Sequence, residues 1–189
     1  MRIIAGKLKG SKLNIPDDKS TRPLKDLARE SIFNLISHSS NISFKFEKSN
    51  ILDLYSGTGS FGLECLSRQA EYVYFIESKK TAFEILKKNI TKLKVEKKTK
   101  IFLNDVFYIL EKKDFFKLKF DIIFCDPPFK NINIKQLIEL IYNKSLLKKD
   151  GIIVLHRNKK SKEKFPNYFE IIDERTYGIS KIIFGKFLF

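Results

Sequence analysis

A four-residue segment, Asp126-Pro127-Pro128-Phe129, has residue types that can hold an amino group for reaction. It follows the apolar run 120–125, which predicts a short buried strand, and open α/β sheets bind ligands where such strands end. The two prolines fix φ and remove two backbone donors, so their carbonyls have no partner within the loop. A carboxylate, outward carbonyls and an aromatic ring suit a nucleobase with an exocyclic amino group. We interpret Asp126, Pro127 and Phe129 as candidate catalytic residues; a plain turn in which Asp126 caps a helix is the alternative.

The second candidate for chemistry is a glycine-rich turn, in which Gly57, Gly59 and Gly62 have the G-x-G-x-x-G spacing between a predicted strand and a predicted helix. Such a turn lets the backbone approach a nucleotide cofactor closely. Asp53, just before the turn, would repel a pyrophosphate but could hold an ammonium group, directly or through water. The turn therefore favours S-adenosylmethionine over NAD, and a tight turn without a ligand is the third interpretation.

Carboxylates also follow the next two predicted strands. Glu77 suits a ribose diol, and Asp105 could accept a hydrogen bond from an adenine amino group. Because successive parallel strands end at one edge of a sheet, one extended ligand could touch all these positions. We predict S-adenosylmethionine as the cofactor, with the binding residues Asp53, Tyr55, Gly57, Gly59, Glu77, Ser78, Asp105, Val106 and Asp126.

The elements that must position these residues follow from the apolar periodicity of the chain. Strands are predicted over 51–54, 72–76, 101–103, 120–124 and 151–155, and helices over 61–68, 81–93, 106–111 and 134–147. This alternation predicts a doubly wound, Rossmann-like α/β fold. Two further strand-like runs, 169–175 and 180–187, predict a hairpin. We therefore expect a mostly parallel sheet of seven strands whose last strand is antiparallel.

The N-terminal part of the chain has a different pattern. Residues 1–22 are basic and alternate over short stretches, which predicts a hairpin or an arm, and helical spacing follows from Leu24 to about His38. We expect an N-terminal basic hairpin and helix extension over 1–45 and a Rossmann-like α/β domain over 46–189.

Composition limits the classes of partner. The net charge of +15 favours a polyanion such as nucleic acid, although most of the charge is lysine, which also covers solvated helix faces. Cys65 and Cys125 lie in apolar stretches, and His38 and His156 stand alone, so we expect no metal. No signal peptide is visible, and no apolar run approaches the roughly 20 residues that cross a bilayer. We expect a soluble, cytoplasmic protein without a membrane partner.

The motifs resemble a known family, the class I methyltransferases, and within them the RsmD-type enzymes that methylate N2 of a guanine in bacterial 16S ribosomal RNA. The resemblance covers nearly the whole chain. It is carried by Arg2-Ile3-Ile4-Ala5-Gly6-Lys7, Thr21-Arg22-Pro23, Arg29-Glu30-Ser31-Ile32-Phe33-Asn34, Asp53-Leu54-Tyr55-Ser56-Gly57-Thr58-Gly59 and Asp126-Pro127-Pro128-Phe129. The family usually has Ala in place of Ser56 and Tyr in place of Phe129, so the hydrogen bond of that tyrosine hydroxyl is absent from this chain.

The resemblance implies methylation of a guanine N2 in 16S rRNA, within an assembled or assembling small ribosomal subunit. By resemblance and charge, RNA phosphates would contact Arg2, Lys7, Lys9, Arg22 and Arg29, and a solvated basic arm is the alternative. We expect a monomer, because no uncovered apolar helix face stands out. A DNA amino-methyltransferase acting on adenine N6 or cytosine N4 is a second hypothesis, but the chain has no spare length for a target-recognition domain. A noncatalytic RNA-binding assembly factor is the third.

Overall fold

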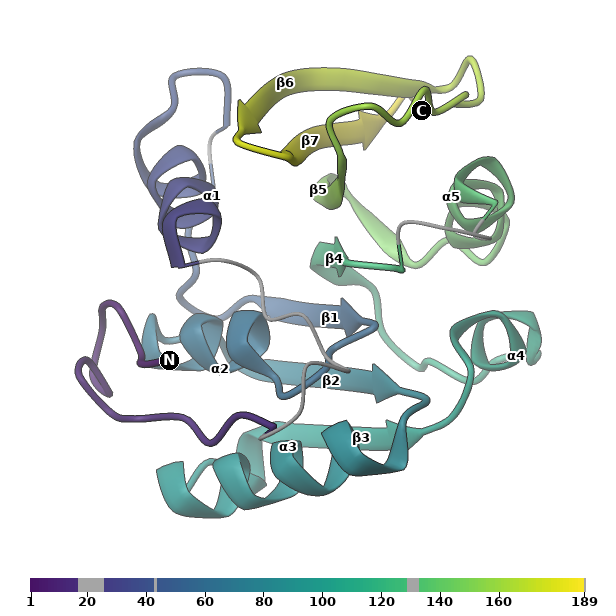
Figure 1. The fold of residues 1–189 in the computed structure, drawn as a ribbon. Helices are drawn as coiled ribbons and strands as arrows, with labels where there is room; N and C mark the ends of the chain where they lie inside the picture. Colours follow the sequence, from purple (N-terminus) through teal and green to yellow (C-terminus); the bar gives the residue numbers. More distant parts are fainter. Residues whose placement is uncertain (17–25, 43, 129–132, 189) are drawn as a thin grey trace.

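A seven-stranded sheet forms the centre of the computed structural model, which describes residues 1–16, 26–42, 44–128 and 133–188 (Figure 1). The strand order is β3-β2-β1-β4-β5-β7-β6. The strands are β1 (Asn50–Leu54), β2 (Tyr72–Glu77), β3 (Thr99–Leu103), β4 (Phe120–Cys125), β5 (Leu147–Asn158), β6 (Phe169–Tyr177) and β7 (Ser180–Phe187). The first five pair in parallel, and β7 is antiparallel to both of its neighbours. The predicted α/β architecture with an antiparallel last strand is confirmed.

Helices cover both faces of the sheet. The helices are α1 (Asp26–His38), α2 (Ser60–Ser67), α3 (Lys80–Leu93), α4 (Val106–Glu111), α5 (Ile134–Asn143) and the short 3-10 helix η1 (Glu96–Lys98). Figure 1 shows α1, α2 and α3 on one side of the sheet and α4 and α5 on the other. Successive strand residues point to opposite faces, so Ile122 belongs to one buried cluster and Ile123 to the other. Burial on both faces explains the continuous apolar runs in the sequence.

Within the described residues, no helix has the length and apolar character needed to cross a membrane.

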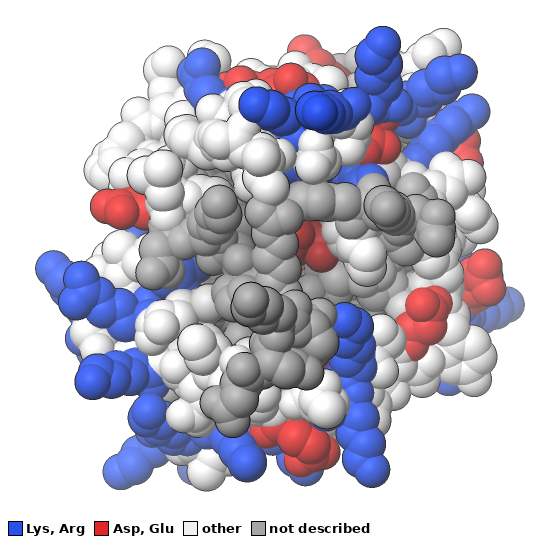
Figure 2. All heavy atoms as spheres, in the orientation of Figure 1, with Lys and Arg blue, Asp and Glu red and all other residues white. Residues whose placement is uncertain are grey.

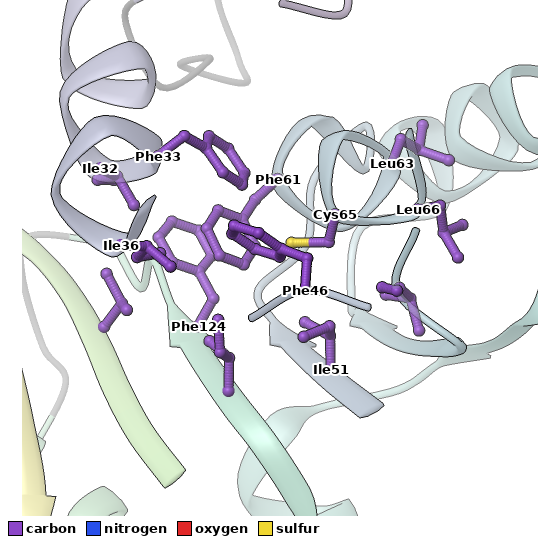
Figure 3. Close-up of a cluster of buried hydrophobic side chains, with 14 of the residues drawn as sticks. Ile32, Phe33, Ile36, Phe46, Ile51, Phe61, Leu63, Cys65, Leu66 and Phe124 are labelled. Atoms are coloured by element: carbon purple, nitrogen blue, oxygen red, sulfur yellow. The ribbon is translucent and has the colours of Figure 1, made fainter. Parts of the chain in front are cut away.

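An aromatic stack joins two helices to the strand that precedes Asp126. The ring of Phe61 in α2 lies between those of Phe33 in α1 and Phe124 in β4, with ring centroids 5.1 Å and 3.9 Å apart (Figure 3). Stacked aromatic pairs add about 0.5–1.5 kcal/mol each beyond their buried area. The stack therefore fixes α1 and α2 against the strand that carries the predicted acceptor loop.

The helix predicted over 134–147 is wrong at its C-terminal end. Helix α5 ends at Asn143, Ser145 takes a left-handed conformation with φ of 51°, and β5 begins at Leu147. Leu147 pairs with Phe120 of β4, whose N–H donates to the carbonyl of Leu146 at 2.7 Å. Leu146 and Leu147 fit the helical period, but both are buried by β-pairing instead.

The N-terminal segment forms a loose hairpin. Arg2 and Lys12 form an antiparallel bridge, and the N–H of Leu13 donates to the carbonyl of Met1 at 3.1 Å. Ile3 and Leu13 are buried in the same cluster as α1 and the sheet. The hairpin prediction is confirmed over these residues, while 17–22 lie outside the described part of the chain. The division between 1–45 and 46–189 stays a prediction.

Candidate active site

The carboxyl ends of β1, β2 and β4 meet at one edge of the sheet. Leu54 pairs with Ile76 of β2 on one side and with Cys125 of β4 on the other. Beyond the strands, the N–H of Ser56 donates to the carbonyl of Ile76 at 2.9 Å, and the N–H of Asp126 donates to that of Leu54 at 3.4 Å. These bonds bring the glycine-rich turn and the acceptor loop, residues Asp126-Pro127-Pro128, to one place.

The glycine-rich turn has a backbone shape that depends on glycine. Gly57 and Gly59 have φ values of 56° and 83°, a left-handed region in which a side chain is disfavoured. A Cβ on Gly59 would also lie 2.4 Å from Cδ1 of Leu86. Tyr55 shares the left-handed conformation, with φ of 60°. The turn therefore enters α2 with close packing beneath it: Ser56, Thr58 and Gly59 are buried and Gly57 is half-buried.

Asp53 is fully buried before this turn and has one carboxylate oxygen to spare. Its Oδ2 accepts the N–H of Gly62 at 3.0 Å, whereas Oδ1 is buried without a hydrogen-bond partner among the described residues. Burial raises the pKa of Asp53 well above its usual value, the hydrogen bond from Gly62 opposes this, and the charges of Asp126 and Glu77 raise the pKa further. A buried carboxylate with an unused oxygen fits a cationic ligand group.

Glu77 holds the glycine-rich turn in place. Its Oε2 accepts the N–H of Gly57 and its Oε1 accepts the N–H of Lys79, both at 2.7 Å. A carboxylate can accept about four hydrogen bonds, so both oxygens keep capacity for a diol. Its predicted contact with a ribose stays a prediction.

The remaining predicted cofactor residues line the same edge. Asp105 is exposed and caps α4, with Oδ1 accepting the N–H of Tyr108 at 3.1 Å, and Val106 beside it is buried. Ser78 is exposed after β2. The hydroxyl of Tyr55 is buried without a hydrogen-bond partner among the described residues, and burial raises its pKa. The predicted adenine contact of Asp105 and Val106 stays a prediction.

A buried asparagine links the turn to the N-terminal segment. Asn89 of α3 donates from Nδ2 to the carbonyls of Thr58 and Asn14, at 3.0 Å and 3.1 Å, and accepts the N–H of Asn14 at 2.7 Å. Thr58 lies within the glycine-rich turn, so the end of the N-terminal hairpin reaches the cofactor side of the fold.

The acceptor loop contacts two side chains from the end of β5. Nδ1 of His156 lies 2.7 Å from Oδ1 of Asp126. Nη1 of Arg157 lies 3.0 Å from the carbonyl oxygen of Pro128 and 3.5 Å from that of Pro127. Phe129, the predicted stacking residue, lies outside the described residues.

Sequence reasoning missed the contributions of His156 and Arg157. The sequence patterns point to His156 only as an isolated histidine unsuited to a metal site, and they single out no role for Arg157. Both lie at the carboxyl end of β5, directly after the strand predicted over 151–155, and Leu155 pairs with Cys125 directly before the acceptor loop. The rule that strand ends converge would have indicated them.

The predicted RNA-binding residues do not gather beside the acceptor loop. Lys7 and Lys9 are exposed, but the N–H of Lys7 donates to the carbonyl of Ser67, at the end of α2 away from the glycine-rich turn. Arg29 is completely buried and donates to the carbonyl of Arg2 at 2.7 Å. Arg2 is exposed, and Arg22 lies outside the described residues. In the view of Figure 2, which has the orientation of Figure 1, the Lys and Arg side chains of the described residues lie mainly around the edge of the molecule.

No three His, Cys, Asp or Glu side chains in the described part of the chain converge as metal ligands. Cys65 and Cys125 are buried, and burial raises the pKa of both thiols.

The fold and the site define a class of protein, the Rossmann-like class I methyltransferases. The structure of the Escherichia coli protein yhhF, described as a methyltransferase, superimposes with a TM-score of 0.84 at 26% identity and covers 99% of this chain and 97% of that chain. A structure of the Haemophilus influenzae methylase HI0767 superimposes with a TM-score of 0.78 at 31% identity and covers 99% and 98%. The predicted fold class is confirmed.

The chain belongs to the family described as "Conserved hypothetical protein 95", whose model matches residues 1–186. The proteins named "Ribosomal RNA small subunit methyltransferase D" are among its relatives. The one from Buchnera aphidicola (subsp. Baizongia pistaciae) is 36% identical over 83% of this chain and 76% of its own length. The one from Haemophilus influenzae is 33% identical over 95% and 90%. The predicted resemblance to the RsmD-type family is confirmed.

Proposed function

We propose that this protein methylates the N2 amino group of a guanine in 16S ribosomal RNA, with S-adenosylmethionine as the methyl donor. One observation carries the proposal: β1 and β4 are paired neighbours, so Asp126, whose N–H donates to the carbonyl of Leu54 at 3.4 Å, lies beside the end of the strand that holds the buried Asp53. A site for an amino group therefore adjoins a site for a cation. The names of the relatives support ribosomal RNA as the substrate class.

The residues present fit the cofactor. S-adenosylmethionine supplies an electrophilic methyl group on a positively charged sulfur. The unused Oδ1 of Asp53 would accept from the ammonium group, and Glu77 would accept from the ribose hydroxyls. Asp105 and Val106 would contact the adenine, with Tyr55, Gly57, Gly59 and Ser78 around the ligand.

The acceptor loop would orient the guanine amino group. The lone pair of an exocyclic amine is delocalised into the ring, so acceptors must hold its N–H bonds in the geometry of attack and offset the charge developing on nitrogen. Asp126 and the Pro127 carbonyl would do this, and Phe129 would stack on the extruded base. S-adenosylmethionine would supply the methyl group to this nitrogen and leave as S-adenosylhomocysteine, and the amine proton would then leave to solvent.

The wider setting is part of the same proposal. The substrate would be RNA within an assembled or assembling small subunit, modified in the cytoplasm by a monomer. Arg2, Lys7, Lys9, Arg22 and Arg29 would contact phosphates, and because Arg29 is buried its contact would require a rearrangement of α1 and Arg2.

The test is transfer of labelled methyl to 16S RNA, supplied naked and as small subunits from cells lacking the enzyme, with plasmid DNA in parallel. Asp126→Ala should lower the rate at saturating substrate by about 100-fold. Asp150→Ala, an exposed aspartate near the amino end of β5, is the matched control. Label at one N2-methylguanine is the expected result.

Three outcomes would contradict the proposal. Label in DNA would indicate the DNA amino-methyltransferase. Cofactor binding without transfer to any substrate would indicate the noncatalytic assembly factor. A rate of Asp126→Ala within about twofold of wild type would remove Asp126 from the reaction.

A further inference from the structure

The last residues of β5 contact the acceptor loop from both faces of the sheet. Successive strand residues point to opposite faces. His156 continues the side of Ile152 and Val154, which belong to the cluster under α1 and α2, and Arg157 continues the side of Ile153 and Leu155, which belong to the other. Both are buried, with relative exposures of 5% and 3%. The pairing of β5 with β4 places both beside the loop.

His156 controls the direction of the Asp126 carboxylate. Its Nδ1 is 2.7 Å from Oδ1 of Asp126. A carboxylate oxygen accepts, so this bond requires the tautomer of His156 that carries a proton on Nδ1. This bond occupies one oxygen and leaves Oδ2 for an incoming N–H. A single buried donor thus selects which carboxylate oxygen serves the substrate.

Arg157 controls the direction of the prolyl carbonyls. Its Nη1 lies 3.0 Å from the Pro128 oxygen, an ordinary hydrogen bond, and 3.5 Å from the Pro127 oxygen, the limit of one. Its Nε donates to Oε1 of Glu163 at 2.6 Å, which fixes the guanidinium. The Pro128 carbonyl is therefore bonded, and the Pro127 carbonyl keeps capacity for the substrate.

We propose that His156 and Arg157 are positioning residues of the methyl-acceptor site. His156 orients Asp126 and Arg157 orients the prolyl carbonyls, and neither touches the substrate. The inference rests on the proposed function, because it assigns the acceptor geometry of that reaction. Misplacing an acceptor by about 1 Å can cost roughly 100-fold in rate, so these contacts should affect turnover more than binding.

The experiment compares His156→Leu, which removes the donor, with His156→Asn, whose Nδ2 can replace Nδ1–H. We expect His156→Leu to lower kcat by roughly 10- to 100-fold, with KM for RNA and Kd for S-adenosylmethionine within about twofold of wild type. His156→Asn should restore most of kcat. Arg157→Lys, which keeps the charge but loses the planar fork, should also lower kcat at unchanged Kd. Melting temperatures show whether each variant folds.

A second measurement needs no activity. The chain has two histidines, so a His38→Gln background leaves His156 as the only imidazole signal in ¹⁵N NMR. We expect Nδ1 of His156 to be protonated in the wild-type site and its ¹⁵N chemical shift to change in Asp126→Ala. An unprotonated Nδ1 in the wild-type site would overturn the inference whatever the activity.

The kinetic outcomes separate the two proposals. Transfer by wild type with equal activity in His156→Leu, or equal losses in the Leu and Asn variants, would overturn the positioning role alone. No transfer by the wild-type protein to any RNA or DNA would overturn the proposed function itself.

Discussion

Asp53 shows how burial prepares a single residue for a charged ligand. Its side chain is fully buried, one oxygen accepts the N–H of Gly62, and the other has no partner among the described residues. Burial first, and then the charges of Asp126 and Glu77, raise its pKa. A nearby ammonium group would favour the ionised form and lower that pKa again.

This gives a signed dependence of cofactor affinity on pH. Below its raised pKa, Asp53 is protonated and cannot pair with an ammonium group. The affinity for S-adenosylmethionine should therefore be highest above that pKa and fall as the pH is lowered through it. Binding in this range should release a proton, which calorimetry in two buffers of different ionisation enthalpy detects. Asp53→Asn should bind weakly with no such proton release, and Asp150→Asn should behave as wild type. A wild-type affinity that does not fall as the pH is lowered would contradict this role of Asp53.

At the scale of elements, the N-terminal hairpin is held on α2 by one buried carboxylate. Oε2 of Glu64 accepts the N–H of Ile4 at 2.6 Å, and Oε1 accepts the N–H of Ala5 at 3.0 Å and Nε of Arg68 at 2.9 Å. Glu64 is completely buried. Glu64 thus holds a segment about 60 residues away in sequence, together with the bond from the N–H of Lys7 to the carbonyl of Ser67.

Glu64→Gln should destabilise the protein by about 1–3 kcal/mol, because the amide NH₂ cannot accept from a backbone N–H and leaves a buried donor without a partner. Urea unfolding measures this free energy. Glu84→Gln on α3 is the matched control, since Glu84 is half-exposed and its pair with Lys87 at 3.4 Å should contribute less than about 1 kcal/mol. Similar losses in both variants would mean that the contact with the hairpin does not stabilise the fold.

At the scale of the whole molecule, the net charge of +15 predicts RNA binding that weakens with salt. The hairpin turn lies near the C-terminal end of α2, away from the acceptor loop, so RNA that reaches both would span the α2 face. Lys7 and Lys9 can therefore contact phosphate only if the bound RNA is long enough to extend from the acceptor loop across the α2 face.

The salt dependence of binding tests this contact. If both lysines contact phosphate, the salt dependence of binding should be shallower in the double variant Lys7→Gln/Lys9→Gln. The negative slope of log affinity against log salt concentration should shrink in magnitude by about two. Lys117→Gln/Lys119→Gln is the matched control, because these exposed lysines flank Leu118, which packs against the cluster on the opposite side of the sheet. Equal slopes for both double variants would leave the hairpin as a solvated basic arm.

The sequence alone determined the order of the elements and the edge at which the ligands bind. Strands buried on both faces read as apolar runs, and the residues needed in the turns, such as Gly59 and Pro127, stand where those runs end. These signals are local, because backbone conformation and burial period are set within a few residues. For that reason Asp53, Glu77 and Asp126 could be assigned to one edge before their distances were known.

Only the tertiary structure decided which side chains meet. His156 lies 30 residues from Asp126, and their 2.7 Å contact depends on the register between β4 and β5, which no local period encodes. Burial of Arg29 against Arg2 and the end of α5 at Asn143 have the same origin. In each case a contact with a residue distant in the sequence is more favourable than the conformation that the local pattern predicts. Such contacts form only when the chain is folded.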